Sequence, residues 1–273
     1  MQLREAADAL GVHYQTAYGW VRQGVLPARK VGRGYEVAQE DVARLAASRA
    51  RGSEPSRQIR VRDWSGIAGR FFAALRDGAE TRARAELSRL AGAVSLLDLC
   101  EQVIVPALRR IGEEWLAGEL SIAHEHRASA ICERLIALHA SQPSGRPRGV
   151  AVVATPSGER HSLPALMAAA CLREDHWLVH HLAADLPVAE VLALSADARA
   201  DLIVMSTSTT AAANRARRDF EAARPADWAG MAGMVAPPRL LIGVPGQTLR
   251  DLVLLARGST GNDIQTTPRR TEQ

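Results

Sequence analysis

The sequence has few cysteines and no long run of apolar residues. The three cysteines of this 273-residue chain are an odd number, lie far apart and occur in apolar helical patterns, so we expect neither a disulfide framework nor a zinc site. No apolar stretch approaches the roughly 20 residues that cross a bilayer, and charged residues occupy the first turns of the chain. We therefore expect a cytoplasmic protein that is neither exported nor membrane-spanning.

Positive charge is concentrated at the amino terminus. Residues 1–62 contain eleven Lys and Arg against six Asp and Glu, whereas residues 63–273 contain 23 against 24. A small basic segment joined to a near-neutral body is typical of a polyanion-binding head on a sensing or assembling body. An ordinary solvated surface is the alternative explanation for the same charges.

The basic segment has the pattern of a winged helix, which we expect over residues 1–48. Apolar residues recur at helical spacing over residues 3–10 and, after a break, over 14–23. Glycines and alternation over residues 29–37 predict a short basic hairpin, and a closing helix is predicted at 39–47.

This order of elements resembles the winged-helix heads of the MerR and excisionase families, with residues 13–20 in the place of the recognition helix. The resemblance implies binding to double-stranded operator DNA; a small helical protein-interaction domain is the alternative. The side chains expected to face a DNA groove are Tyr14, Gln15, Tyr18 and Arg22, and those expected to meet phosphates are Arg29, Lys30 and Arg33.

Helical patterns fill the middle of the chain. After a polar linker at residues 49–62, apolar residues recur at helical spacing in four segments of residues 63–140, which predicts a four-helix bundle. A turn containing Gly and Ser separates the last two helices, so Trp115 ends one of them and Glu125-His126 lies one turn into the next.

Trp115, Glu125 and His126 are therefore predicted to converge on one end of the bundle. A tryptophan offers a flat apolar cover, a carboxylate accepts hydrogen bonds from sugar hydroxyls, and a histidine can donate, stack or bind a metal. The alternative is that Trp115 belongs to the core and that the Glu-His pair lies on a solvated helix face.

The last part of the chain alternates apolar strands and helices. After a second linker at residues 141–148, four apolar runs within residues 149–257 are separated by helical segments, which predicts a doubly wound parallel sheet; residues 258–273 form a polar tail that we expect to be disordered. Ligands of such sheets bind beyond the carboxyl ends of the strands. The residues predicted to lie in loops at this edge are His161, Ser206, Ser208 and Gly246.

Residues 158–167 and 182–187 resemble the Rossmann-like cobalamin-binding domain of base-off/His-on proteins, whose motif is Asp/Glu-x-His-x-x-Gly with later Ser-x-Leu and Gly-Gly elements. In that family the histidine replaces the corrin's own base as the lower cobalt ligand, the acidic residue polarises it, and the displaced nucleotide tail enters the sheet. The resemblance implies that His161 is the lower cobalt ligand and Glu159 its acidic neighbour. The residues that correspond to the later, tail-binding elements are Ser206, Ser208, Gly243 and Gly246.

Three positions depart from that motif. Pro164 occupies the place of the glycine, Ser208 that of the leucine, and Pro245 falls where adjacent glycines are expected. Proline has no N–H to donate and does not allow the close backbone approach that glycine does. The sequence therefore supports only part of the pocket that binds the nucleotide tail in that family.

Ahead of this domain, the spacing Trp-x9-Glu-His resembles the cap of CarH-type photoreceptor regulators, and head, bundle and sheet follow in the same order over nearly the whole chain. In that family the tryptophan and glutamate embrace the adenosyl group of adenosylcobalamin, and the histidine takes the upper cobalt position after light breaks the cobalt–carbon bond. The resemblance gives these roles to Trp115, Glu125 and His126. It implies a non-enzymatic repressor that is a homo-oligomer, a tetramer, in the dark and dissociates in light.

Two other functions stay open. A DNA-binding regulator with an altered pocket would act through protein contacts without cobalamin, and Pro164 keeps that possibility alive. A corrinoid carrier that delivers methyl groups to a partner enzyme would use the same bundle and sheet, but the basic head counts against it.

Overall fold

The computed structural model describes residues 1–10, 17–18, 21, 26–31, 34–43, 63–90, 92–140, 145–224 and 237–258. The chain divides into two compact units, Met1–Arg60 and Val61–Gln273. No helix within these described ranges is long and apolar enough to span a membrane. The predicted linker at 49–62 and all of the predicted tail beyond residue 258 lie outside the described residues.

The first unit contains a helix and a hairpin. Helix α1 (Leu3–Ala9) precedes the antiparallel strands β1 (Ala28–Val31) and β2 (Gly34–Val37), which confirms the predicted wing. The amino-terminal ammonium of Met1 donates a hydrogen bond to the carbonyl of Val37 at 3.0 Å and so fastens the start of the chain to the wing. The buried apolar core of this unit consists of Leu3, Ala6, Ala7, Leu10, Ala17, Leu26, Val37 and Val42.

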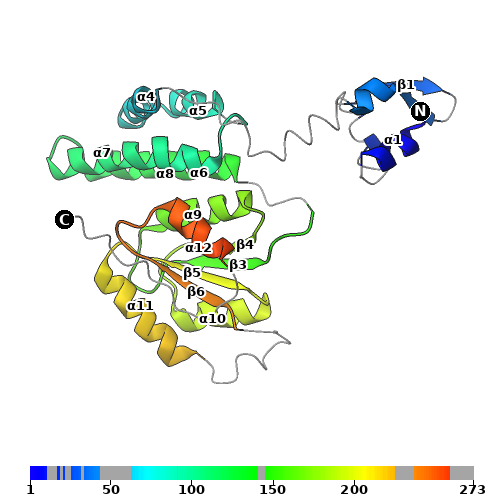
Figure 1. Cartoon of the computed structure of the whole chain (residues 1–273). Coiled ribbons are helices and arrows are strands. Elements are labelled where there is room, and N and C mark those ends of the chain that lie inside the picture. The colour runs from blue at the N-terminus through cyan, green and yellow to red at the C-terminus, as the bar shows by residue number, and fades with distance from the viewer. Residues whose placement is uncertain are drawn as a thin grey trace, which may run out of the picture. The chain divides into compact units, whose positions relative to one another are not determined.

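The second unit begins with the predicted helical bundle, seen in the upper part of this unit in Figure 1. The third of its four helices is continuous but contains a π-helical turn, η1, between α6 and α7. The bounds are α4 (Trp64–Asp77), α5 (Glu80–Ser88), α6 (Leu96–Leu99), η1 (Cys100–Ile104), α7 (Val105–Leu116) and α8 (Ile122–His139).

Local signals explain where the bundle helices begin and end. The Ser95 hydroxyl accepts a hydrogen bond from the Asp98 amide at 3.0 Å, which confirms the predicted start of the third helix. Gly78 ends α4 in the left-handed region at φ 71°, and Gly118 turns the chain at φ 77° before α8. Trp115 thus lies in the last turn of α7, as predicted.

A four-stranded parallel sheet follows, in the order β4-β3-β5-β6, which confirms the doubly wound prediction. Successive residues of β3 point to opposite faces: Ala151 and Val153 pack with α9 and α12, whereas Val152 and Ala154 pack with α10 and α11. The bounds are β3 (Val150–Ala154), α9 (Ser162–Glu174), β4 (Leu178–His181), α10 (Val188–Asp197), β5 (Leu202–Ser206), α11 (Thr210–Ala223), β6 (Arg239–Gly243) and α12 (Leu249–Arg257).

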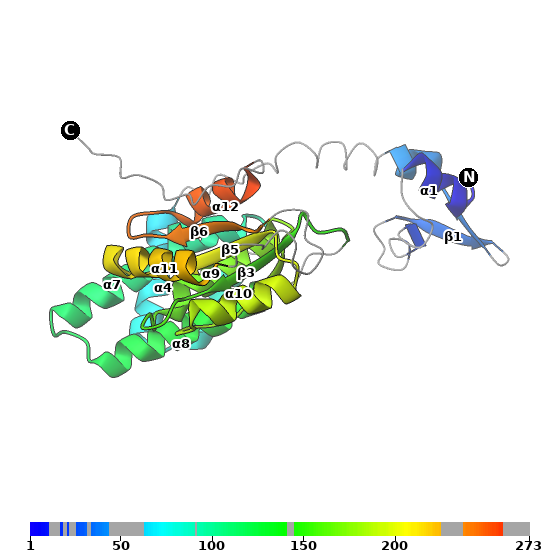
Figure 2. The same cartoon turned by 90° about the horizontal axis from the view of Figure 1, so that it is seen from below.

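The bundle is stacked on the α9 and α12 side of the sheet, with α10 and α11 on the far side (Figures 1 and 2). Leu163, Met167 and Cys171 of α9 belong to the same apolar cluster as the bundle core. The two layers therefore share one core and form one packed body.

Charged side chains of the sheet layer also hold the start of the third bundle helix. The Glu174 carboxylate at the end of α9 accepts hydrogen bonds from the amides of Leu96 at 2.7 Å and Leu97 at 3.3 Å. Arg250 of α12 donates to Asp98 Oδ1 at 2.7 Å, and its amide donates to Glu101 Oε1 at 2.8 Å. The bundle is therefore anchored to the sheet at its α6 end.

All three cysteines are free and buried, in agreement with the prediction that they form no disulfide framework. Cys100 and Cys132 come from the bundle and Cys171 comes from α9. Burial raises the pKa of the Cys132 thiol to about 12, so this thiol stays protonated at neutral pH.

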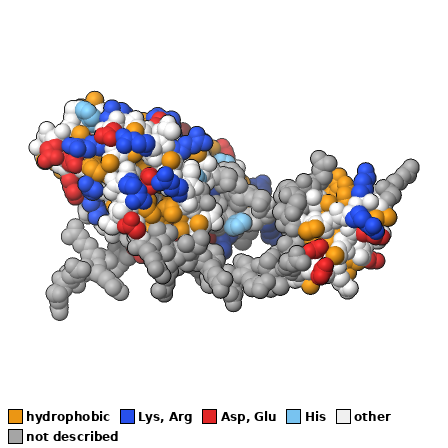
Figure 3. Space-filling model, turned by 90° about the horizontal axis from the view of Figure 1, so that it is seen from above, with side chains coloured by type: hydrophobic (Ala, Val, Ile, Leu, Met, Phe, Trp, Pro, Cys, Tyr) orange, Lys and Arg blue, Asp and Glu red, His pale blue; other side chains and the backbone are white. Residues whose placement is uncertain are grey.

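The outer face of the bundle carries charges of both signs, interspersed with apolar side chains (Figure 3). Ion pairs of the bundle include Arg134 with Glu80 at 2.7 Å and Arg82 with Asp77 at 2.6 Å.

Replacement of Glu174 by alanine should lower the free energy of unfolding by about 1 kcal/mol, because two amides at a helix start lose their acceptor. Urea denaturation followed by circular dichroism measures this loss, and amide exchange at Leu96 and Leu97 should accelerate. Glu221→Ala, which removes an exposed carboxylate of α11, is the control and should change stability by less than about 0.5 kcal/mol. Equal stability of both variants would contradict the anchoring role.

Candidate ligand site at the sheet edge

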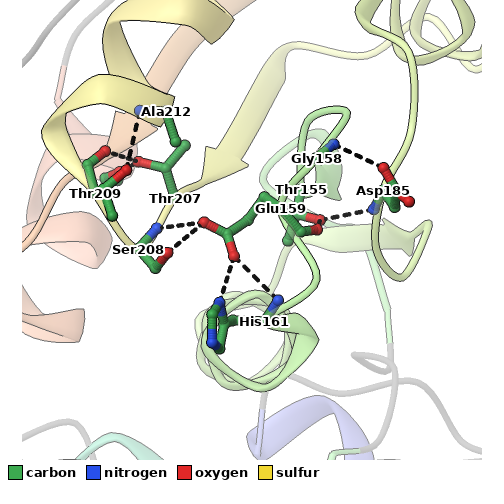
Figure 4. A network of polar contacts seen from close by, with 10 residues as sticks. Thr155, Gly158, Glu159, His161, Asp185, Thr207, Ser208, Thr209 and Ala212 are labelled. Carbon is green, nitrogen blue, oxygen red and sulfur yellow. Dashed lines mark hydrogen bonds and ion pairs between the residues drawn. The ribbon is translucent and has the colours of Figure 1, made fainter.

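The loop that follows β3 is fixed to the loop that follows β4 (Figure 4). The buried Thr155 hydroxyl donates to the carbonyl of Glu159 at 2.7 Å and accepts from the Asp185 amide at 2.9 Å. In return, the Asp185 carboxylate accepts from the amide of Gly158 at 2.7 Å. Gly158 has φ 83°, a left-handed conformation that glycine adopts without strain. These contacts set the direction in which Glu159 and His161 leave the loop.

The Glu159 carboxylate is 4% exposed and makes four hydrogen bonds. One oxygen, Oε1, lies 2.6 Å from His161 Nδ1 and accepts from the His161 amide at 3.1 Å. The other, Oε2, accepts from the amide and the hydroxyl of Ser208 at 2.7 and 2.6 Å. The carboxylate therefore joins the loops that follow β3 and β5.

Two opposing influences set the pKa of Glu159. Burial raises it, but the hydrogen bonds from the Ser208 hydroxyl and amide and from the His161 amide and ring lower it by more, so the pKa falls to about 2. At neutral pH the group is a carboxylate that accepts at both oxygens.

His161 is the N-cap residue of α9, and its side chain is 73% exposed. Nδ1 is engaged by Glu159, and within the described residues no protein group bonds to the other ring nitrogen, Nε2. A buried carboxylate on one ring nitrogen fixes the tautomer and raises the basicity of the other. The pair is thus arranged to present Nε2 as a ligand.

A second Glu-His pair lies in the first turns of α8. His126 Nδ1 is 2.7 Å from Glu125 Oε2, while Glu125 Oε1 accepts from the Ser129 hydroxyl at 2.9 Å. Trp115 is 41% exposed at the end of α7, so it does not belong to the bundle core. Trp115 lies in the last turn of α7 and the Glu125-His126 pair in the first turns of α8, on either side of the turn that joins these helices.

The two pairs are separate but border the same side of the body. The Ser162 hydroxyl, next to His161, donates to Glu133 of α8 at 3.2 Å. His126 is seven residues before Glu133 and so lies on the same helix face, roughly 10 Å along the axis at 1.5 Å per residue. Figures 1 and 2 both place the α7–α8 turn and the carboxyl ends of the strands on the same side.

The residues predicted to bind the nucleotide tail fall in different places. Ser206 and Gly243 line a small cavity at the carboxyl ends of β5 and β6. Ser208 instead bonds to Glu159, and Gly246 lies in the turn before α12 at φ 87°.

Three of the seven predicted DNA-contacting residues lie in the described part of the head. Arg29 and Lys30 are exposed on β1, and the Arg29 guanidinium is 3.5 Å from Glu36 of β2. Tyr18 is half-buried, with its ring edge-on to Tyr35 at 5.7 Å, so it packs on the wing. The residues outside the described part are Tyr14, Gln15, Arg22 and Arg33.

Sequence reasoning did not assign roles to Thr155, Asp185 or Glu133. Asp185 stands within the 182–187 segment that carried the resemblance, so its presence there was a usable signal. The sequence gives no such signal at Thr155 or Glu133, because their hydrogen-bond partners depend on which loops and helices lie side by side.

Fold and site together define a class of protein. Residues 67–138, which span most of the bundle, match the family of B12 binding domains, and residues 1–50 match a helix-turn-helix domain. The sheet layer has the doubly wound form expected beside such a bundle. The chain therefore has the domain organisation of a regulator with a DNA-binding head and a B12 binding domain.

The chain is homologous to two transcriptional repressors of Myxococcus xanthus. It is 28% identical to the HTH-type transcriptional repressor CarH over 79% of this chain and 80% of that protein. It is 25% identical to the HTH-type transcriptional repressor CarA over 76% of each chain.

The fold of the second unit is also found in a solved structure, the monomethylamine corrinoid protein of Methanosarcina barkeri. The TM-score is 0.53 at 10% identity, over 68% of this chain and 94% of that one. This likeness supports the architecture of bundle and sheet.

The free energy of unfolding should depend on pH through Glu159. Because folding lowers its pKa from 4.5 to about 2, its contribution is present above pH 4.5 and is lost as the pH falls towards 2; it amounts to about 3 kcal/mol at about 1.4 kcal/mol per unit. Glu159→Gln should remove this pH dependence, measured by urea denaturation between pH 3 and 7. Glu221→Gln should retain the wild-type profile. A Glu159→Gln variant with an unchanged profile would refute the depressed pKa.

Proposed function

We propose that this protein is a DNA-binding transcriptional repressor that senses light through bound adenosylcobalamin. The helix-turn-helix and B12 binding matches and the homology to CarH and CarA support a cobalamin-sensing, DNA-binding regulator. The adenosyl form, the response to light, the change of oligomeric state and the cytoplasmic location are proposed from the resemblance described above. The proposal involves no catalytic turnover.

The observation that carries the proposal is the orientation of His161. Its Nδ1 is held by the buried Glu159 carboxylate, and its exposed side chain leaves Nε2 for a ligand. An imidazole oriented in this way would hold a cobalt corrinoid, which would bring the remaining ligands of its metal. We assign His161 as the lower ligand and Glu159 as the residue that orients it.

The end of the bundle would cover the upper face of the cofactor. Trp115 supplies an exposed flat surface, and Glu125 offers a carboxylate to sugar hydroxyls of the adenosyl group. Adenosylcobalamin, when bound, supplies a cobalt–carbon bond that light breaks. We assign His126, already oriented by Glu125, as the imidazole that occupies the upper position after illumination.

Assembly would couple this site to DNA. In a dark homotetramer several heads bind one operator, and their effective concentration raises the overall affinity well above that of one head. In the light the bundle shifts, the oligomer dissociates and DNA is released. Exposed Arg29 and Lys30 of the wing would contact phosphates.

A second candidate is a repressor that works through protein contacts alone. The observation in its favour is the small cavity at β5 and β6, with Pro164 in its wall, where a cobalamin tail pocket would otherwise be expected. This candidate requires that the protein binds no corrinoid.

Dark-purified protein mixed with adenosylcobalamin should show a cobalamin spectrum shifted towards histidine ligation, and green light should convert it irreversibly. Size-exclusion chromatography in the dark should give a tetramer that becomes smaller after illumination, with loss of binding to operator DNA. An unchanged cobalamin spectrum would favour the second candidate. A bound cofactor whose oligomer ignores light would reject the sensor.

Two histidine variants separate the proposed roles. His161→Ala should lose the histidine-ligated spectrum already in the dark, because it removes the lower imidazole. His126→Ala should bind normally in the dark and differ in the illuminated product alone. His124→Ala is the matched control, since His124 lies two residues away and bonds to Ser121 at 2.7 Å; it should behave as wild type in both states. A dark defect in His126→Ala would contradict its assignment.

A further inference from the structure

The cavity behind His161 is small for a nucleotide. It lies between α9, α12 and the carboxyl ends of β5 and β6, and it measures about 110 Å³. Pockets for small-molecule ligands usually measure about 300–1,000 Å³. Pro164, three residues after His161, forms part of its wall. In the cobalamin-binding family that the sequence resembles, the displaced nucleotide tail enters the sheet, and the residues in the place of the tail-binding elements include Ser206 and Gly243 of this cavity.

Hydrogen bonds hold the wall formed by the turn before α12. The Gln247 side chain turns back to accept from the Val244 amide at 3.4 Å, and the Gln247 amide donates to the Val244 carbonyl at 3.1 Å. Thr248 and Asp251 cap α12 reciprocally, at 3.0 and 3.2 Å. Arg250, on the same helix turn, is tied to the bundle. Enlarging the cavity from this side would break several of these bonds together.

The lining is also a poor match for a phosphodiester. Among the described residues, those that line the cavity include no Lys, Arg or His, and Pro164 has no N–H to donate. The Thr207 hydroxyl already donates to the carbonyl of Gly243 at 2.6 Å. The side chains of Ser206, Gln247 and Thr248 offer neutral hydrogen bonds alone, which are weaker partners for a phosphodiester than charged donors.

We infer that this protein holds the corrin ring through His161 and leaves the nucleotide tail outside the sheet, so that its ligand class is adenosyl corrinoids irrespective of the tail. This inference rests on the proposed function, and it narrows that function: recognition comes from the ring and the adenosyl group. Complete cobalamins and tail-less cobinamides then become equivalent ligands.

The test compares adenosylcobalamin with adenosylcobinamide, which lacks the nucleotide tail. Full-length protein is titrated with each in the dark, and Kd is measured by calorimetry and by the absorbance change on ligation. The two Kd values should agree within threefold. Binding of adenosylcobalamin more than tenfold tighter would overturn the inference and leave the proposed function standing. Absence of binding by both would overturn the proposed function together with the inference.

The Gly243→Ala variant provides an independent test of where the nucleotide tail lies. A methyl group at Gly243 would meet its nearest atoms at 3.7 Å, an ordinary contact, so the fold accepts it while the cavity shrinks. With the tail outside, both Kd values should stay within twofold of wild type. Selective weakening of adenosylcobalamin by more than fivefold would place the tail in the cavity and overturn the inference. Ser208→Ala, which alters the Glu159 contact and not the cavity, should weaken both ligands alike.

Discussion

The buried carboxylate of Glu159 is the interaction on which the geometry of the sheet edge depends. Four donors surround it, from the loops after β3 and β5, and two of the four come from Ser208. A carboxylate this deeply buried is tolerated when its lone pairs are satisfied and is costly otherwise. The two loops and the imidazole therefore hold their positions together, and displacement of either Ser208 or His161 leaves the buried charge with only two of its four donors.

The attachment of the bundle is uneven along its length. Glu174 and Arg250 hold the start of its third helix, and Ser162 contacts the middle of α8. At the other end, Leu116 and Ile122 flank the α7–α8 turn with 77% and 58% of their surface exposed. The end that carries Trp115 is thus joined to the sheet by fewer polar contacts than the end that carries Leu96. A ligand between that end and the sheet would contact a part of the bundle with little else to restrain it.

Periodicity and turn residues were enough to predict the fold. The apolar run at Val150–Ala154 and capping at Ser95 are properties of neighbouring residues, so the strands and helices followed from local patterns. The Glu159–His161 pair was predictable for the same reason, since only one residue separates its members. Ser208 was assigned to the tail pocket from its place in the motif, whereas its contact with Glu159 spans 49 residues and has no local signal. That contact depends on β3 pairing with β5, which no local pattern encodes.

The size of the cavity lay beyond sequence reasoning as well. Pro164 and Pro245 signalled an altered pocket, but its volume depends on how the Gln247 side chain folds back and on how α12 is fixed to the bundle. Such features follow from packing between elements that are distant in the chain. The sequence could indicate that the pocket departs from the motif that it resembles, and the structure supplies the volume of the cavity.

The π-helical turn at Cys100–Ile104 lets one continuous helix serve two partners. An added residue rotates everything after it by about 100° relative to a regular helix. Before the turn, Asp98 faces α12; after it, Ala107 and Ile111 face the bundle core. The buried apolar residues on both sides of the turn belong to the one cluster that the bundle shares with α9. The same helix therefore makes its polar contacts with the sheet layer before the turn and continues into the bundle core after it, so the junction between the two layers lies within a helix and not in a loop.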